Sequence, residues 1–158
     1  MKNPYAKTVG FELLHAARLH RARSAQLLSE LGLFPGQEQV LTLLSAENGR
    51  TMGELATNLR VRPPTASKTV ARLTAQGLVE RLSSGRDGRT VRVGLTTEGR
   101  RRAEAVEAVW EALEREAVGE IDGKDRKRLR KLLRKLGQNV SKKLGGAEIA
   151  EFEGPIED

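Results

Sequence analysis

Three charged side chains stand close together in the loop of a β-hairpin predicted for residues 81–96. Two short runs of alternating apolar and polar residues flank the loop, which holds Arg86, Asp87 and Arg89. Asp87-Gly88 is a pair that tolerates positive φ at a hairpin turn. A hairpin needs only its turn residues, so the two arginines indicate that the tip binds a negatively charged partner. A narrow DNA minor groove suits them, because it concentrates negative potential and accepts the weakly hydrated guanidinium.

A second group of polar residues follows a double proline. Pro63 and Pro64 suit the first turn of a helix, which Gly77 ends as the residue after the C-cap. The outward positions of this helix offer hydroxyls, an ammonium and a guanidinium, which can bind phosphates and guanine edges in the major groove of DNA. The prolines would add apolar contact surface. The candidate DNA-contacting residues of the helix are therefore Pro63, Pro64, Thr65, Ser67, Lys68 and Arg72.

The positive charge of the chain is localised. Of 28 Lys and Arg and 21 Asp and Glu, the segment 50–102 holds twelve basic and four acidic residues. The remainder holds sixteen basic and seventeen acidic residues, so the middle third carries the entire excess of +7. A localised field of this kind is typical of a surface that binds phosphates. The basic run 124–135 differs, because it lies opposite a leucine stripe; we interpret it as a solvated helix face rather than a second DNA contact.

The periodicity of the chain predicts the elements that position these residues. Helices are expected over 8–31, 36–47, 51–59, 63–76, about 97–118 and about 125–144, with strands over 78–82 and 90–95. Thr51 and Glu54 form a capping box at the start of the third helix. The order of helix, tight turn, helix, strand, Arg-rich loop and strand predicts a winged helix-turn-helix. One apolar set would hold its helices together: Leu55, Ala56, Leu59, Val61, Val70, Leu73 and Leu78.

The fold class is thus mainly α with a small β-hairpin. We expect an N-terminal dimerisation helix over 1–34, a winged helix-turn-helix DNA-binding region over 35–99, C-terminal dimerisation helices over 100–145 and an acidic flexible tail over 146–158. The dimerisation role is inferred from apolar stripes on the N- and C-terminal helices, because the winged region would cover little of these stripes. The last helix carries one of them: Leu129, Leu132, Leu133, Leu136, Val140 and Leu144.

The stretch DGRTVRVGLTTEG, residues 87–99, resembles the wing signature of the MarR family of transcriptional regulators. The matching positions are Asp87, Arg89, Val93, Leu95, Thr96 and Gly99, without a gap. Residues 51–81 resemble the helix-turn-helix of the same family. The resemblance implies a homodimer that binds double-stranded DNA, with Arg89 in the minor groove and Asp87 as its support. Arg86 stands where many members carry an acid or a small polar residue, which implies stronger wing contacts.

The resemblance also implies a small aromatic or phenolic effector, bound between the dimer helices and the winged region. Arg18, His20 and Arg21 on the first helix are the candidate ligand-binding residues. The functional prediction is a sequence-specific transcriptional regulator, a ligand-responsive repressor that binds a pseudo-palindromic operator as a homodimer. The alternative is a winged-helix module that binds protein or RNA without operator specificity.

Other classes of protein fit the sequence poorly. The chain has no cysteine, so thiolate chemistry, disulfides and cysteine-ligated metals are excluded. His15 and His20 point about 140° apart on a helix and cannot share one metal ion. We find no Gly-rich phosphate loop and no clustered Ser, His and Asp, so we expect neither an enzyme nor a cofactor or metal site. Without a signal peptide or an apolar run of about 20 residues, a soluble, cytoplasmic protein with no membrane partner is expected.

Overall fold

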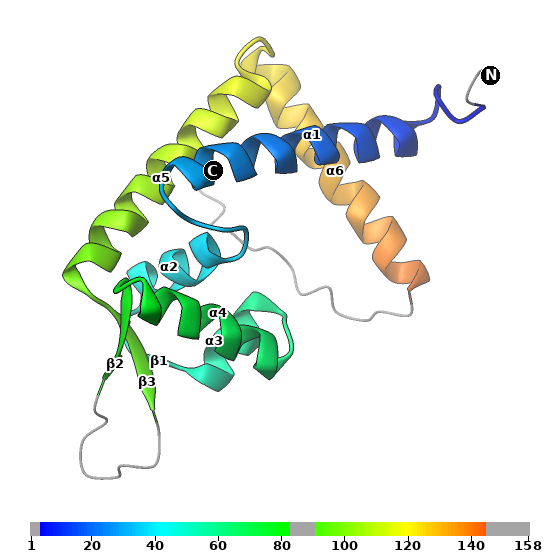
Figure 1. Cartoon of the computed structure of the whole chain (residues 1–158). Helices are drawn as coiled ribbons and strands as arrows, with labels where there is room; N and C mark the ends of the chain where they lie inside the picture. Colours follow the sequence, from blue (N-terminus) through cyan, green and yellow to red (C-terminus); the bar gives the residue numbers. More distant parts are fainter. Residues whose placement is uncertain (1–3, 83–90, 145–158) are drawn as a thin grey trace. The chain divides into compact units, whose positions relative to one another are not determined.

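The computed structural model describes residues 4–82 and 91–144. The chain separates into two compact units, Met1–Ala117 and Val118–Asp158, which are treated separately below. The elements of both units are labelled in Figure 1. Among the described residues, no helix combines the length and the apolar character needed to cross a membrane.

Two helices begin the first unit. α1 (Val9–Glu30) starts at the N-cap Thr8, whose hydroxyl accepts a hydrogen bond from the Phe11 amide at 3.2 Å. α2 (Gln37–Ala46) starts after Gly36, one residue later than the sequence predicts. Its inward face is buried, with Val40, Leu41 and Leu44 fully enclosed. α1 contributes chiefly its last turn to this core, through Leu28.

The winged helix-turn-helix follows α2. It consists of β1 (Arg50–Thr51), α3 (Met52–Leu59), α4 (Pro63–Ala75), β2 (Val79–Leu82) and β3 (Arg92–Leu95). The three strands form an antiparallel sheet in the order β1-β3-β2, with Val79 opposite Leu95 and Arg50 opposite Val93. Figure 1 shows α3 and α4 side by side next to this sheet. The predicted fold class is confirmed, with one strand more than the sequence predicts.

The core of the unit is an aliphatic cluster shared by the end of α1, by α2, α3, α4 and α5 (Thr97–Val118), and by the sheet. Most of the predicted set is in it: Leu55, Leu73 and Leu78 are each at most 2% exposed. Val61 is an exception at 36% exposed, because it lies in the turn between α3 and α4 and not on a helix face. The strand predicted over 90–95 begins later, at Arg92; Val91 precedes it and is 44% exposed.

The chain continues into two long helices. α5 (Thr97–Val118) buries Ala103, Val106 and Leu113 in the first unit. α6 (Gly123–Lys143) belongs to the second unit and begins at the N-cap Asp122, whose carboxylate accepts hydrogen bonds from the Lys124 and Asp125 amides. None of its residues is buried. The predicted leucine stripe of α6 is therefore uncovered, with Leu132 53% and Val140 51% exposed.

Candidate nucleic-acid interface

α4 has one buried and one exposed face along its whole length. Ala66, Val70 and Leu73 recur at helical spacing and turn inward against the core. The prolines at 63 and 64 occupy the first two helical positions, and the Thr65 amide donates to the Arg62 carbonyl at 2.9 Å. Gly77 follows the C-cap Gln76 with a φ of +72°, a conformation that glycine adopts without strain. The predicted start of this helix at Pro63 is thus confirmed, and its last residue, Ala75, comes one residue earlier than predicted.

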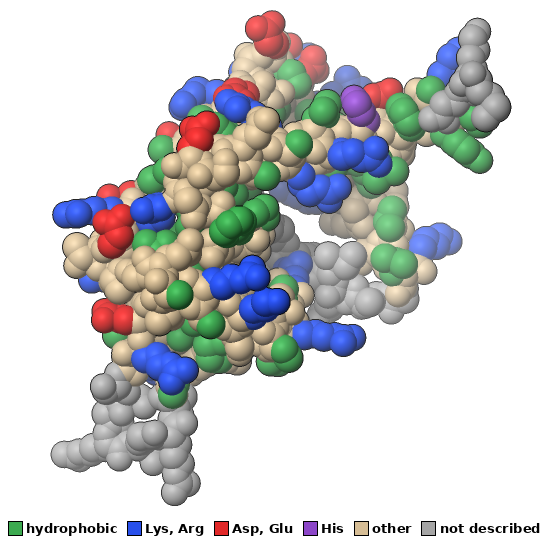
Figure 2. Space-filling model, viewed as in Figure 1, with side chains coloured by type: hydrophobic (Ala, Val, Ile, Leu, Met, Phe, Trp, Pro, Cys, Tyr) green, Lys and Arg blue, Asp and Glu red, His purple; other side chains and the backbone are tan. Residues whose placement is uncertain are grey.

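The predicted DNA-contacting residues of α4 all lie on the exposed face. This holds for Pro63, Pro64, Thr65, Ser67, Lys68 and Arg72. In Figure 2, Lys and Arg side chains lie over the part of the surface that α3 and α4 form in Figure 1. The hydroxyl, ammonium and guanidinium groups therefore stand on one side of a helix whose other side is fixed in the core.

The basic residues of the segment 50–102 fall into two classes. Several arginines are engaged within the protein: Arg50 pairs with Glu47 at 3.0 Å, and Arg102 pairs with Glu98 at 3.2 Å. Arg92 donates to the Gly49 carbonyl at 2.6 Å and lies 4.0 Å from Glu54. Within residues 4–82 and 91–144, by contrast, the side chains of Arg62, Lys68 and Arg72 have no hydrogen-bond or ion-pair partner. The charges of Lys68 and Arg72 on α4, and of Arg62 at its N-cap, are therefore available to a ligand.

The capping box of α3 supports the helix-turn-helix locally. The Thr51 amide donates to the Glu54 carboxylate at 2.6 Å, and the Glu54 amide donates to the Thr51 hydroxyl at 3.2 Å. These hydrogen bonds, with the nearby Arg92 and Arg50, lower the pKa of Glu54. The box is the one predicted from the sequence. It fixes the start of α3, whose inner face then carries Leu55 and Ala56 into the core.

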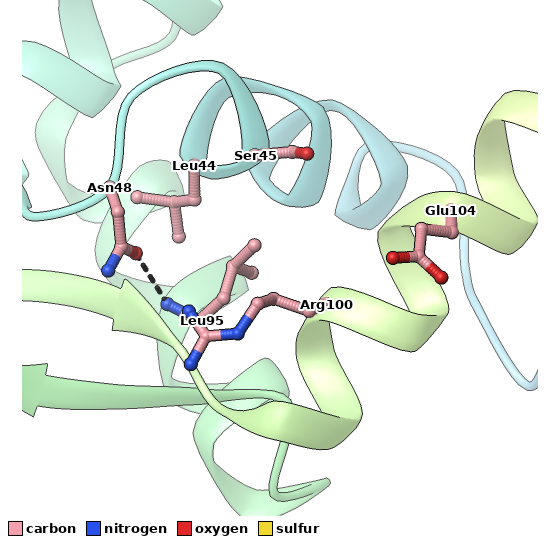
Figure 3. Close-up of a pocket in the computed structure, with 6 residues that line it drawn as sticks. All are labelled: Leu44, Ser45, Asn48, Leu95, Arg100 and Glu104. Carbon is pink, nitrogen blue, oxygen red and sulfur yellow. Dashed lines mark hydrogen bonds between the residues drawn. The ribbon is translucent and has the colours of Figure 1, made fainter.

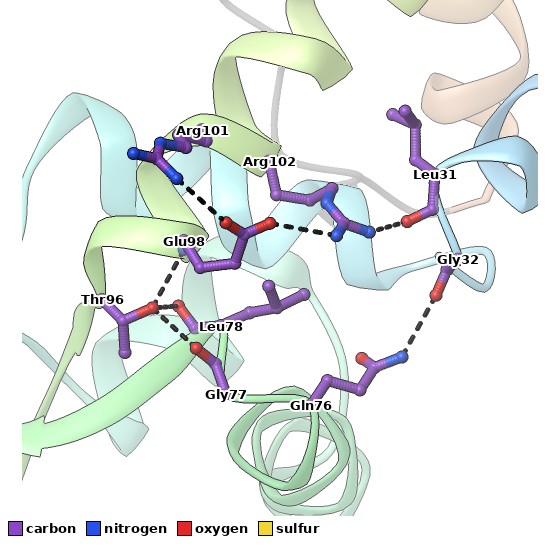
Figure 4. Close-up of polar contacts among 10 residues, drawn as sticks. Leu31, Gly32, Gln76, Gly77, Leu78, Thr96, Glu98, Arg101 and Arg102 are labelled. Carbon is purple, nitrogen blue, oxygen red and sulfur yellow. Dashed lines mark hydrogen bonds and ion pairs between the residues drawn. The ribbon is translucent and has the colours of Figure 1, made fainter.

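The base of the wing is joined to α5 at a close contact between Gly99 and the Leu78 carbonyl. A Cβ atom at residue 99 would lie 1.9 Å from that oxygen, so only glycine fits. The Thr96 hydroxyl donates to the Gly77 carbonyl at 2.7 Å and accepts from the Gly99 amide at 2.9 Å. Figure 4 shows Thr96 in this contact. The Leu-Thr pair and the glycine of the sequence motif thus act as the joint between β3 and α5.

The predicted wing, tail and effector residues take no part in the contacts described above. Arg86, Asp87 and Arg89 fall outside the described residues, as does the predicted acidic flexible tail over 146–158. Arg18, His20 and Arg21 are described, and all three are exposed on α1. On an ideal helix, His20 points about 160° away from Arg18, so the two side chains leave α1 on nearly opposite sides.

A small hollow lies between α2, β3 and α5 (Figure 3). It measures about 160 Å³, and its lining residues are Leu44, Ser45, Asn48, Leu95, Arg100 and Glu104. The Asn48 side-chain oxygen accepts a hydrogen bond from the Leu95 amide at 2.8 Å, which occupies part of its polar lining. The hollow is smaller than the roughly 300–1,000 Å³ that ligand pockets usually have. It also shares no residue with the predicted effector site.

Sequence comparisons place this geometry among DNA-binding regulators. Residues 23–90 match the sequence model of the MarR family. The chain is 35% identical over 107 residues to the uncharacterized HTH-type transcriptional regulator ML2140 of Mycobacterium leprae, covering 68% of this chain and 70% of that protein. It is 28% identical over 131 residues to the HTH-type transcriptional repressor Rv2887 of Mycobacterium tuberculosis, covering 83% and 94%. These relatives are named as regulators and not as enzymes.

Solved structures agree with the sequence comparisons. A probable transcriptional regulator from Pseudomonas aeruginosa superposes with a TM-score of 0.70 at 28% identity, covering 82% of this chain and 97% of that one. MarR from E. coli in its apo form gives 0.68 at 27% identity, covering 81% and 96%. MepR of S. aureus, solved as a DNA complex, gives 0.73 at 22% identity, covering 84% and 98%; at that identity the likeness concerns the fold alone.

Proposed function

The chain belongs to the MarR family of transcriptional regulators, and from that premise we propose that it is a repressor that binds a pseudo-palindromic operator as a homodimer. In this proposal α4 enters the major groove of each half-site, and the loop between β2 and β3 carries Arg89 into the adjacent minor groove. Asp87 braces Arg89, and Arg86 adds a phosphate contact. The repressor role is supported by the name of the relative Rv2887, a transcriptional repressor.

The observation that carries the DNA assignment is the unpartnered basic face of α4. Lys68 and Arg72 are exposed and, among the described residues, have no carboxylate near them, although Glu47, Glu54 and Glu98 neutralise neighbouring arginines. A cation without an internal partner remains available to a phosphate or a guanine edge. RNA phosphates would attract the same groups, so the match to the MarR family is what favours DNA over RNA as the partner.

The homodimer is supported by the apolar surface of α6. Leu132 and Leu133 are 53% and 44% exposed on a helix that buries none of its residues, and its C-cap Leu144 is 59% exposed. Burying such a stripe against a second copy would stabilise the dimer by removing apolar surface from water. We expect an interface of roughly 2,000 Å² or more, the size of obligate dimers. Half-sites would then lie about one helical turn of DNA apart.

An effector completes the proposal. A small aromatic or phenolic anion would bind near Arg18 and Arg21, which are three residues apart and share a side of α1, and it would favour a dimer geometry that does not fit the operator. It can act only through better binding to that geometry, with a coupling of about 1–3 kcal/mol.

The decisive experiment is a selection of duplexes from a random DNA library by the wild-type chain, followed by fluorescence anisotropy. We expect an enriched pseudo-palindrome that binds at least 10³-fold more tightly than scrambled DNA, as specific regulators do. Light scattering at micromolar concentration should give twice the mass of one chain. Recovery of no enriched sequence, or a monomer mass, would contradict the proposal. Release of the selected duplex by aromatic acids or phenols tests the effector separately.

A further inference from the structure

Side chains from two other helices hold the backbone that follows α1 (Figure 4). Arg102 of α5 donates from Nη1 to the Leu31 carbonyl and from Nη2 to Glu98 at 3.2 Å. Gln76, the C-cap residue of α4, donates from Nε2 to the Gly32 carbonyl at 3.1 Å. Two consecutive carbonyls at the end of α1 therefore attach to α5 and to α4, respectively.

A buried glutamine fixes the orientation of Gln76. Gln37 is 2% exposed, and its Nε2 donates to the Gln76 Oε1 at 3.1 Å. The Gln37 Oε1 accepts from the Phe34 amide at 2.9 Å, which leaves its nitrogen as the group that must donate toward Gln76. Because buried amides need partners, this bond directs the oxygen of Gln76 to Gln37 and its nitrogen to Gly32.

The apolar packing of α4 fixes which face of the helix turns inward, but it constrains the angle of the helix axis less closely. Ala66, Val70 and Leu73 hold the helix against the core, but apolar contacts are non-directional. Hydrogen bonds restrict angle as well as distance. The bonds of Gln76 lie at one end of α4, so a small change there would displace the exposed residues several turns away.

We propose that Gln76 is a positioning residue that sets the angle of α4 relative to α1, with Arg102 as the second attachment of the same loop. The inference rests on the proposed function in one respect: the angle matters for binding because α4 is the helix assigned to the major groove. A dimer must place two such helices at one spacing to fit an operator. Binding to phosphates alone tolerates a wider range of angles, so specific binding should depend on Gln76 more than non-specific binding.

Spin labels can measure the angle in the absence of DNA. Ala22 on α1 and Ala71 on α4 are exposed, and the chain has no native cysteine, so Ala22→Cys and Ala71→Cys give unique attachment points. Double electron–electron resonance is recorded on full-length chains diluted with unlabelled protein. Gln76→Met removes both hydrogen bonds of the side chain. Gln76→Glu keeps an acceptor for Gln37 but cannot donate to the Gly32 carbonyl. Gln138→Glu, at an exposed position of α6, is the control.

Both Gln76 variants should widen the distance distribution between the labels, whereas the control leaves it unchanged. Gln76→Met should lower the melting temperature more than Gln76→Glu does, because it leaves the buried Gln37 nitrogen without its partner. A merely structural role would make the two readouts change together. An unchanged distribution in both Gln76 variants would overturn the proposal.

DNA binding then tests the consequence of the changed angle. Gln76→Met should weaken binding to the selected duplex about two- to tenfold, because the angle of α4 must then be restored on binding at a cost comparable to about one neutral hydrogen bond, and it should affect scrambled DNA less. Equal losses on both DNAs would overturn the positioning role. If the wild-type chain selects no sequence, the proposed function fails, but the label distances still decide whether Gln76 sets the angle of α4.

Discussion

Arg23 on α1 and Glu116 on α5 form a two-pronged ion pair across 93 positions of sequence. Nε and Nη2 of Arg23 donate to the two carboxylate oxygens at 2.7 and 2.8 Å. The hydrogen bonds from Arg23 lower the pKa of Glu116, and the bonded carboxylate raises the pKa of Arg23. Parallel bonds of this kind restrict orientation more than a single contact does. The pair joins α1 to α5 through polar side chains.

We predict that Glu116→Gln lowers the melting temperature by a small amount near neutral pH. A carboxyl group whose pKa is lowered on folding contributes stability above its unfolded pKa, and this is lost as the pH falls through the folded value. The difference from wild type should therefore disappear in acid. It should also shrink in high salt, because both side chains are more than 40% exposed. Glu111→Gln is the control, since the Glu111–Arg115 contact is 3.9 Å long and highly exposed.

Glu38→Gln should stabilise the protein at neutral pH. Glu38 is 5% exposed at the start of α2, and burial raises its pKa, although its Oε2 accepts from the Gly36 amide at 2.7 Å. A raised carboxyl pKa favours the protonated folded state, so its contribution is present below the unfolded pKa and is lost as the pH rises through the folded pKa. Glutamine can accept the same hydrogen bond without a charge.

Urea denaturation at several pH values distinguishes relief of the buried Glu38 charge from the general effect of removing one negative charge. The gain from Glu38→Gln should be largest above the folded pKa and absent at low pH, where the wild-type group is protonated. Glu107→Gln, at an exposed position of α5, should show no such dependence. A gain that is constant across pH would contradict the assignment to burial.

Gly99→Ala should destabilise the first unit by roughly 1–3 kcal/mol, the usual cost of forcing an extra methyl group into a packed site. The new Cβ would meet the Leu78 carbonyl oxygen, which is backbone and cannot move aside like a flexible side chain. Gly137→Ala in α6 is the matched control: nothing lies within 4 Å of its Cβ position, and alanine favours a helix by about 1 kcal/mol over glycine. In denaturant unfolding we expect Gly99→Ala to lower the free energy of unfolding and Gly137→Ala to raise it.

Lys68→Ala should cost roughly 1–3 kcal/mol on the selected duplex if Lys68 reads a guanine edge. Arg50→Ala is the comparison, because Arg50 is already engaged by Glu47 and is only 19% exposed. We expect it to affect stability more than DNA affinity. Anisotropy on the selected and scrambled duplexes separates base reading from phosphate binding. A Lys68 loss of equal size on both DNAs would assign Lys68 to a phosphate.

Arg89→Ala should weaken binding to every DNA sequence, because a minor-groove arginine reads shape more than bases. The dependence of binding on salt should become shallower by about one contact. Asp87→Ala should have the same effect more weakly, since the arginine remains but loses its brace. Affinity titrations at several salt concentrations measure both. Undiminished binding by Arg89→Ala would refute the wing assignment.

Local signals predicted much of the fold because they act over a few residues. The capping box of Thr51 and Glu54 and the stop at Gly77 depend on neighbouring backbone, and both are confirmed. β1 was not predicted, because two residues show no periodicity and the strand exists only through its pairing with β3. The exposure of Val61 likewise follows from its place in a turn, which apolar character alone does not reveal.

The candidate site likewise has one part that could be predicted from sequence and one part that could not. The exposed face of α4 follows from helical spacing, so its contact residues could be proposed from sequence. The separation of engaged from unpartnered arginines could not, because the partners of Arg92 and Arg102 come from distant segments. The link between Gln37 and Gln76 joins residues 39 positions apart and has no sequence signature.

The double proline at the start of α4 changes what this helix can offer to DNA. Most helices present free amide hydrogens in their first turn, and these can hold a phosphate oxygen without any side chain. Here Pro63 and Pro64 have no amide hydrogen, and that of Thr65 is already bonded to Arg62. In the proposed complex, hydrogen bonds from the first turn of α4 to the DNA backbone would therefore come from side chains. Single substitutions of those side chains would then change the affinity of α4 for DNA without changing the backbone of the helix.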